Sequence, residues 1–348
     1  MQSPEIRLGC NTNAYVPLYT AKQAVEIIKD IGIKFVELSS ERELTQALYH
    51  DPARFERYYG NLMGVIKKNG QEVIATCSWV RDASWVSERD EDARWGGARI
   101  LYSLIDMARI LGAERIMTPF GTIRGPSDMS EGYIEKSIDN GVEAWIKASK
   151  YAAKENEFGP KLKLLEMEAM SYLFDLPTTI EQARLVLNKI RELQKKSGEL
   201  YADILLRYDV AHAPSKEEST DKDDFNIMGW LNAFPTDIIA FHLKGYKDEE
   251  GRAVVPMAGE YFERGREITY GLIDAIESMN ELRTQAGASP LKTVDVIIEG
   301  IILKERNFER KKTENANAET IENVKSFFKE GNYEENSKTS LLVKKSFF

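Results

Sequence analysis

Acidic residues and a histidine stand at the ends of four apolar runs in the second half of the chain. Glu168 closes the run LLEME, Asp209 follows LLRY, His242 closes IIAFH and Glu299 closes VDVIIE. Carboxylate oxygens and an imidazole nitrogen are better ligands for Mn²⁺, Mg²⁺ or Co²⁺ than for a metal that prefers thiolates. If the four runs are neighbouring strands that end at the same height, these side chains converge, and we predict that they bind one divalent metal.

The alternation of residues along two of these runs predicts a second charged layer. Every second side chain of a strand shares a face, so Glu166 accompanies Glu168, and Arg207 accompanies Asp209. With Glu168 and Asp209 directed to the site, we hypothesise that Glu166 and Arg207 form a buried ion pair beneath the metal and orient its ligands. The competing register makes Glu166 the ligand and leaves Glu168 in the following loop.

Eight short apolar runs alternate with amphipathic stretches along the chain. The pattern predicts strands at Ile6–Cys10, Lys34–Leu38, Glu72–Cys77, Arg115–Thr118, Leu162–Met167, Asp203–Tyr208, Ile238–His242 and Val294–Glu299. Helical periodicity predicts helices at Ala21–Ile31, Pro52–Lys68, Glu88–Leu111, Ser130–Glu155, Thr179–Lys196, Ile268–Leu282 and, more briefly, Phe225–Asn232. Strand–helix repeats with near-continuous apolar strands are typical of a parallel sheet covered on both faces, and eight repeats predict an α/β fold with a single (β/α)8 TIM barrel.

No linker divides the chain, so we assign residues 1–330 to the barrel. Residues 331–348 are predicted to be a C-terminal extension that packs on the barrel or at a subunit interface. The polar segments Pro214–Asp224 and Lys247–Arg266 are predicted to be long loops. Both lie at the C-terminal face of the barrel, where such enzymes carry their substrate-binding loops.

The composition of the chain indicates which classes of binding partner to expect. Among 348 residues, 47 are basic and 56 acidic, so the net charge is −9, and no basic cluster is present to attract a phosphate backbone. We therefore expect no nucleic-acid partner. Two cysteines suit a reducing compartment. The start lacks a secretory pattern and no run is long enough to span a bilayer, so we expect a cytoplasmic protein without a membrane partner.

Several side chains near the predicted strand ends are candidates for the substrate pocket. Trp79 directly follows the third strand and is the best aromatic candidate for lining a substrate pocket there. Trp95 lies at helical spacing, and we expect it to pack in the core. Asn13, like Asn11 and Glu37, is predicted to lie at the barrel mouth. Lys244-Gly245 and Arg264-Gly265 are the basic candidates for an anionic group near the seventh strand.

In its order of elements and its strand ends, the chain resembles the xylose-isomerase-like barrels of the sugar (phosphate) isomerase and epimerase group. In that family a Glu, an Asp, a His and a second Glu from strands five to eight hold one divalent metal, usually manganese. A substrate-contacting His follows the Asp by three residues. The resemblance implies a Mn²⁺ site at Glu168, Asp209, His242 and Glu299, with His212 contacting the substrate.

The stretch MEAMSYLFDLPTTI resembles more narrowly the branch that acts on tetrulose phosphates. In that branch the fifth strand runs into Glu-Pro-Met-Ser, so the similarity implies that Ser171 contacts the substrate. The chain departs from the pattern at Ala169, Leu173 and Phe174, which stand in place of two prolines and an arginine.

The resemblance implies an isomerase that acts on a sugar or sugar phosphate, either a ketose 3-epimerase or an aldose–ketose isomerase. The reaction would pass through a metal-stabilised enediolate, with Glu168 and Glu299 as the acid/base pair and His212 polarising a substrate oxygen. Dimers and tetramers are common among such barrels, so we expect a homo-oligomer.

Two alternatives remain open on the same barrel. One is a subunit of a metal-dependent enzyme that cleaves C–C or C-glycosidic bonds with the same ligands. The other is a non-catalytic sugar-binding barrel. The related abasic-site endonucleases use a three-metal cluster that needs many histidines, and this chain has only three, of which His212 and His242 are well placed.

Overall fold

The computed structural model describes most of the chain. The described residues are 3–15, 19–40, 47–78, 86–122, 131–170, 175–212, 219–244, 262–299, 318–319 and 321–326. The predicted C-terminal extension, residues 331–348, lies outside them.

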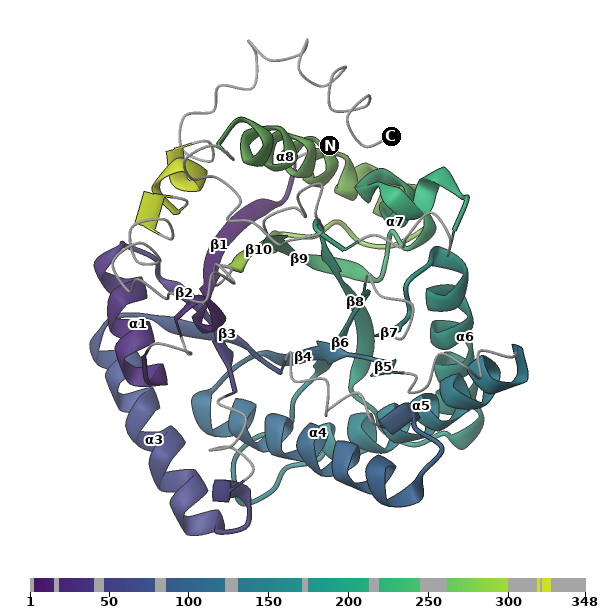
Figure 1. Cartoon of the computed structure of the whole chain (residues 1–348), viewed down its shortest axis with the longest axis horizontal. Helices are drawn as coiled ribbons and strands as arrows, with labels where there is room; N and C mark the ends of the chain where they lie inside the picture. The colour runs from purple at the N-terminus through teal and green to yellow at the C-terminus, as the bar shows by residue number, and fades with distance from the viewer. Residues whose placement is uncertain are drawn as a thin grey trace, which may run out of the picture. The chain divides into compact units, whose positions relative to one another are not determined.

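The main sheet is a closed barrel of eight strands, as the sequence predicts. Its order is β1-β10-β9-β8-β6-β4-β3-β2, and the pairs with a described register are parallel (Figure 1). The strands are β1 (Glu5–Asn11), β2 (Phe35–Ser39), β3 (Glu72–Cys77), β4 (Arg115–Pro119), β6 (Leu164–Glu168), β8 (Asp203–Asp209), β9 (Ile238–Lys244) and β10 (Thr293–Glu299). Each predicted strand exists, with its ends displaced by at most a few residues.

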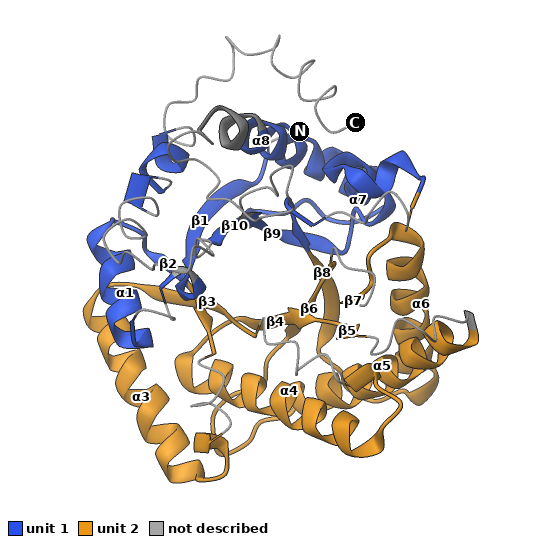
Figure 2. Cartoon of the chain, in the orientation of Figure 1, with its two compact units in different colours: residues 1–36, 208–213, 220–348 blue, residues 37–207, 214–219 orange. Residues whose placement is uncertain are grey.

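Two compact units divide the chain, and two of the four divisions fall inside strands (Figure 2). Unit 1 consists of residues 1–36, 208–213 and 220–348, and unit 2 of residues 37–207 and 214–219. Strands β2 and β8 each begin in one unit and end in the other.

Unit 1 contains the parallel strands β1, β10 and β9. Its helices are α1 (Ala21–Asp30), α7 (Ile227–Ala233) and α8 (Phe262–Gln285), with the short 3-10 helices η1 (Thr12–Ala14) and η4 (Lys222–Phe225). Ile28 of α1, Trp230 of α7 and Phe241 of β9 are buried in its core. Helix η1 follows β1 directly and holds Asn13 beside the end of that strand.

Unit 2 contains β3, β4, β6 and most of β8, with the helices α3 (Pro52–Lys68), α4 (Glu91–Leu111), α5 (Glu131–Ala152) and α6 (Ile180–Ser197). The side chains of Asp51, Asp90 and Thr179 accept hydrogen bonds from the first turns of α3, α4 and α6. Gly112 and Gly198 end α4 and α6 in the left-handed conformation that glycine adopts without strain.

Three local features differ from the sequence prediction. Helix α8 begins at Phe262, so the end of the segment predicted as a loop, Lys247–Arg266, is helical. The other predicted loop, Pro214–Asp224, contains the start of η4. Two-residue strands β5 (Gly121–Thr122) and β7 (Asp175–Leu176) pair antiparallel beyond the ends of β4 and β6. Such short strands carry no periodic signal in the sequence.

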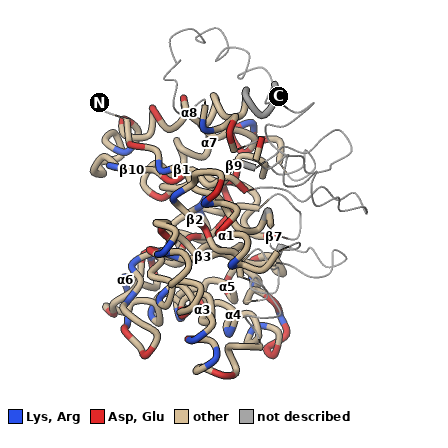
Figure 3. Tube along the Cα trace, turned by 90° about the vertical axis from the view of Figure 1, so that its left-hand side faces the viewer, with Lys and Arg blue, Asp and Glu red and all other residues tan. Residues whose placement is uncertain are grey.

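Charged residues of both signs are interspersed along the described trace (Figure 3). Many form short-range surface pairs, such as Lys147 with Glu143 at 2.6 Å and Lys189 with Asp139 at 2.6 Å. In the part of the chain that the structure describes, no helix has both the length and the apolar character that crossing a bilayer requires.

Candidate metal centre

Three of the predicted metal ligands come from consecutive strand ends of unit 1. Asp209 is the last residue of β8, His242 lies near the end of β9, and Glu299 is the last residue of β10. All three side chains are buried. Residue Ile297 of β10 lies opposite His242, so the parallel register places Glu299 two residues further toward the end of the barrel. The Nδ1 atom of His242 is 3.3 Å from Oε2 of Glu299.

The fourth residue, Glu168, is the last residue of β6, the strand that pairs with β8. The register sets Glu168 opposite Arg207, two residues before Asp209 on the same strand. Glu168 is buried, and the ligand atoms of Glu168, Asp209, His242 and Glu299 all lie within 4.8 Å of one another. The expectation that these four side chains converge is therefore met, and we call this group the carboxylate–histidine cluster.

The chemistry of the cluster fits a divalent cation. Small divalent cations bind oxygen at about 2.1 Å, so opposite ligands lie about 4.2 Å apart, and a group within 4.8 Å closes on an ion with small side-chain movements. Three carboxylates gathered away from water repel one another and lose their hydration. A bound cation offsets both costs, and this buried group of acids and one histidine could hold one.

Neighbouring backbone and side-chain groups contact two of the carboxylates. The backbone N–H of Ala211 donates to Oδ1 of Asp209 at 2.8 Å. The imidazole Nε2 of His212 is 3.4 Å from the other oxygen, Oδ2 of Asp209. The amide Nδ2 of Asn13 donates to Oε1 of Glu299 at 3.1 Å. His212 and Asn13, both predicted from sequence as substrate residues, thus lie directly against the cluster.

Asn13 is fixed with one end of its amide unsatisfied. Its backbone N–H donates to the Asn11 side chain at 2.7 Å, an arrangement that also begins helix η1. Its side-chain nitrogen donates to Glu299, whereas its buried oxygen Oδ1 accepts no hydrogen bond from the described residues. A buried acceptor without a donor is costly, so a ligand hydroxyl at this position would satisfy it.

Tyr208 precedes Asp209 on β8 and belongs to the core. Its ring packs against Trp230 and Phe241, with centroids 5.7 and 6.5 Å away. Burial raises the pKa of the Tyr208 phenol, and the nearby carboxylates of Asp209 and Asp224 raise it further. The phenol therefore stays protonated, and Tyr208 supports the strand that carries Asp209.

The charged layer predicted below the cluster is present in unit 2. Arg207 Nε donates to Oε2 of Glu166 at 3.0 Å, and its Nη2 makes a further short contact with the same oxygen. Both side chains are fully buried. The predicted Glu166–Arg207 ion pair is confirmed. Glu166 is committed to this pair, and Glu168 rather than Glu166 lies in the cluster.

Two further residues, Glu37 and Arg115, contact this ion pair, and the sequence analysis predicted neither contact. Glu37 was expected at the barrel mouth, but it lies in the middle of β2, fully buried, and accepts from Arg207 Nη1 at 2.8 Å. Arg115, the first residue of β4, lies 3.1 Å from the second oxygen of Glu166. The available signal was a charge inside an apolar run, FVELS, which is costly in a strand interior unless it is paired.

The remaining predicted substrate residues are not tested by the geometry. Trp79 and Ser171 lie outside the described residues. Lys244 is the last residue of β9, where the register sets its backbone opposite Glu299.

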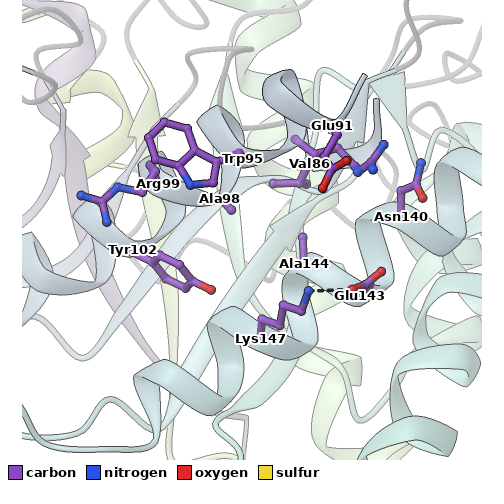
Figure 4. A pocket seen from close by; sticks show the side chains of 11 residues that line it. Val86, Glu91, Trp95, Ala98, Arg99, Tyr102, Asn140, Glu143, Ala144 and Lys147 are labelled. Atoms are coloured by element: carbon purple, nitrogen blue, oxygen red, sulfur yellow. Dashed lines mark hydrogen bonds and ion pairs between the residues drawn. The ribbon is translucent and has the colours of Figure 1, made fainter. Parts of the chain in front are cut away.

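Trp95 contradicts the expectation that it packs in the core, because 65% of the residue is exposed. It lines a cavity of about 310 Å³ between α4 and α5 (Figure 4). Arg99 and Tyr102 of α4 line the same cavity, as do Glu143 and Lys147 of α5. The helical period that suggested core packing instead directs Trp95 into this hollow, whose lining contains none of the cluster residues.

Comparison with known proteins shows which solved structures share this fold. No family model and no curated protein sequence matches the chain. Its structural neighbours are xylose-isomerase-like TIM barrels, and the described strands form a barrel of that kind. The chain therefore shares the (β/α)8 barrel fold of these proteins, as the eight strand–helix repeats predicted.

Three solved structures illustrate the likeness. A candidate xylose isomerase from Rhodospirillum rubrum shares 16% identity over 92% of this chain and 97% of that one, with a TM-score of 0.64. A D-psicose 3-epimerase from Clostridium cellulolyticum, solved with D-tagatose, shares 11% identity over 92% and 99%, with a TM-score of 0.61. The IolI protein, solved with a bound zinc atom, shares 14% identity over 98% and 99%, with a TM-score of 0.59.

Proposed function

We propose that this protein is a divalent-metal-dependent epimerase or isomerase of sugars or sugar phosphates. The observation that carries the proposal is the carboxylate–histidine cluster, four buried side chains whose ligand atoms lie within 4.8 Å of one another at the ends of the strands. The neighbours with this fold include a D-psicose 3-epimerase and an L-ribulose 3-epimerase, which supports a ketose as substrate.

Glu168, Asp209, His242 and Glu299 would hold the metal, with Mn²⁺ as the proposed ion. The mostly oxygen donor set favours a hard cation, while the IolI neighbour contains zinc. When bound, a divalent cation supplies Lewis-acid polarisation of a carbonyl and an adjacent hydroxyl.

Glu168 and Glu299 would move the proton at the substrate carbon. They belong to β6 and β10, which are separated in the sheet by β8 and β9, so the two carboxylates approach a common centre from different strands. One removes the proton and the other returns it on the opposite face in an epimerisation; transfer along one face gives an isomerisation.

His212 and Asn13 would orient the substrate. His212 lies against Asp209, where its imidazole can donate to a substrate oxygen. Asn13 holds Glu299 through its nitrogen, and its oxygen is buried without a donor from the described residues. A substrate hydroxyl that donates to this oxygen would be fixed beside the carboxylate that exchanges its proton.

Deuterium incorporation tests this proposal directly. The protein, loaded with Mn²⁺ in D₂O, is incubated with a panel of ketoses and ketose phosphates and followed by NMR. We expect exchange at the carbon next to the carbonyl of at least one compound, with an epimer or aldose as product. Glu299→Gln should abolish this exchange, whereas Lys196→Met, a substitution on the outer surface of α6, should leave it unchanged.

Three outcomes contradict the proposal in different ways. Cleavage products without epimer or aldose would indicate the C–C or C-glycoside-cleaving alternative. Sugar binding without exchange would indicate a binding protein. Wild-type protein that binds no divalent metal would remove the basis of the chemistry.

A further inference from the structure

Four charged side chains form a buried network inside unit 2. Glu37 of β2, Arg115 of β4, Glu166 of β6 and Arg207 of β8 are each at most 4% exposed. We call these four residues the arginine–glutamate network. The two positive and two negative charges of these four side chains are equal in number, and Arg115 also lies 3.5 Å from the carboxylate of the exposed Glu114.

Arg207 is the bridge of this network. Its guanidinium donates through Nη1 to Oε2 of Glu37 at 2.8 Å and through Nε and Nη2 to Oε2 of Glu166. Arg115 lies 3.1 Å from the remaining oxygen of Glu166. The planar fork of arginine donates in fixed directions, so these bonds define the position of Arg207 relative to β2 and β6.

Stability alone is a weak explanation for such a network. Removing four charged groups from water costs several kcal/mol per ion, and well-packed apolar residues often stabilise a core equally well or better. Buried charges with fixed hydrogen bonds do, however, specify one register and one geometry. The network is thus better suited to positioning than to stabilisation.

The residues that the network positions are two members of the carboxylate–histidine cluster. Glu168 follows Glu166 by two residues on β6, and Asp209 follows Arg207 by two residues on β8, so each pair shares a strand face. Arg207 is also the register partner of Glu168, and its carbonyl accepts the N–H of Ala169 at 3.3 Å. A slip at Arg207 would displace Glu168 and Asp209 together.

We infer that Arg207 is a positioning residue for the candidate metal centre. By bridging Glu37 and Glu166, it fixes the height at which Glu168 and Asp209 leave their strands. This inference rests on the proposed function only in requiring that the cluster binds a metal. Arg207 is not one of the four residues whose ligand atoms form the cluster.

Arg207→Lys tests the inference, because lysine keeps the positive charge but cannot bridge two carboxylates with a fixed fork. The matched control is Arg7→Lys, since Arg7 makes a two-bond ion pair with Asp295, near the start of β10, at 2.6 and 2.9 Å. Electron paramagnetic resonance of free Mn²⁺ gives the dissociation constant of each variant at a temperature where circular dichroism shows it folded.

We expect Arg207→Lys to weaken Mn²⁺ binding about 10–100-fold, the range found for residues that orient metal ligands. Arg7→Lys should bind Mn²⁺ within about twofold of the wild type, although it loses comparable hydrogen bonds and melts at a lower temperature. If Arg207→Lys does not fold, Glu37→Gln decides, because it leaves the Arg207–Glu166 pair intact and should still weaken Mn²⁺ binding several-fold.

A purely structural network would lower the melting temperature of the variants and leave their Mn²⁺ affinity at the wild-type value; that result overturns the inference. If the wild type and Arg7→Lys both fail to bind Mn²⁺, it is the metal centre itself that fails. The two failures are therefore distinct.

Discussion

Two charged layers, each buried, differ in how their charge is balanced. The arginine–glutamate network contains two arginines and two glutamates, which neutralise one another through side-chain contacts. The carboxylate–histidine cluster contains three carboxylates and one imidazole, and two of its members, Glu168 and Asp209, follow Glu166 and Arg207 by two residues on β6 and β8. The first layer is complete with the chain's own atoms, whereas the second has an excess of acid. The excess of acid in the second layer is what the proposed divalent cation would offset.

The largest loss of stability is expected when Arg207 is removed from the arginine–glutamate network. Arg207→Met leaves the buried carboxylates of Glu37 and Glu166 without the guanidinium between them. Removing one partner of a buried pair typically costs about 3–5 kcal/mol, and urea unfolding measures this loss. The triple variant Arg207→Met, Glu37→Gln, Glu166→Gln removes the orphaned charges and should recover part of it. An unchanged free energy of unfolding in Arg207→Met would show that the layer is not balanced in this way.

The next largest effect is expected when Mn²⁺ binds to the carboxylate–histidine cluster. Because only the folded protein gathers the cluster, Mn²⁺ at 100 times its dissociation constant should stabilise the fold by about 2.7 kcal/mol. Thermal unfolding with and without Mn²⁺ measures the shift, and EDTA should reverse it. The Glu299→Gln variant should show little shift, and an equal shift in that variant would place the ion elsewhere.

Replacing one glutamate by glutamine should change the free energy of unfolding less, and in opposite directions in the two layers. In metal-free protein, Glu299→Gln removes one of three mutually repelling carboxylates and should raise stability by about 1 kcal/mol, as found when strained functional sites are relieved. Glu166→Gln removes a carboxylate that faces two arginines and should lower stability. Urea unfolding of both variants in EDTA tests the contrast, and destabilisation by both would contradict it.

The smallest effect is expected for a charge pair on the outer surface. Lys147 lies 2.6 Å from Glu143, one turn away on α5, and both side chains are more than half exposed. Lys147 lowers the pKa of the Glu143 carboxyl, first through a hydrogen bond and then through its charge. A lowered folded-state pKa means that the contribution is present at neutral pH and is lost as the pH falls through that value.

Lys147→Met should therefore cost only about 0.3–0.5 kcal/mol at pH 7 and nothing at a pH where Glu143 is protonated in both states. Urea unfolding at the two pH values measures the difference. A loss as large as that of Arg207→Met would remove the distinction between buried and exposed charges.

The eight-strand barrel was predictable because each strand is an apolar run with its own helical stretch behind it. Strand β3 and helix α3 have the bounds that periodicity assigns them, Glu72–Cys77 and Pro52–Lys68. The four cluster residues were predictable for the same reason, since each ends an apolar run and parallel neighbours end together. Ser171 and Trp79 remain predictions.

The sequence by itself determined the order of the elements, the Glu166–Arg207 pair and the acidic character of the strand ends, since these follow from local periodicity. Only the tertiary structure decided that Glu37 lies inside β2 and accepts from Arg207, that Asn13 holds Glu299, and that Trp95 lines a hollow outside the core. Each of these depends on contacts between residues distant in sequence or on the space between two helices. Alternation along one strand can indicate which residues share its face, but it cannot indicate which residue of another strand lies opposite them.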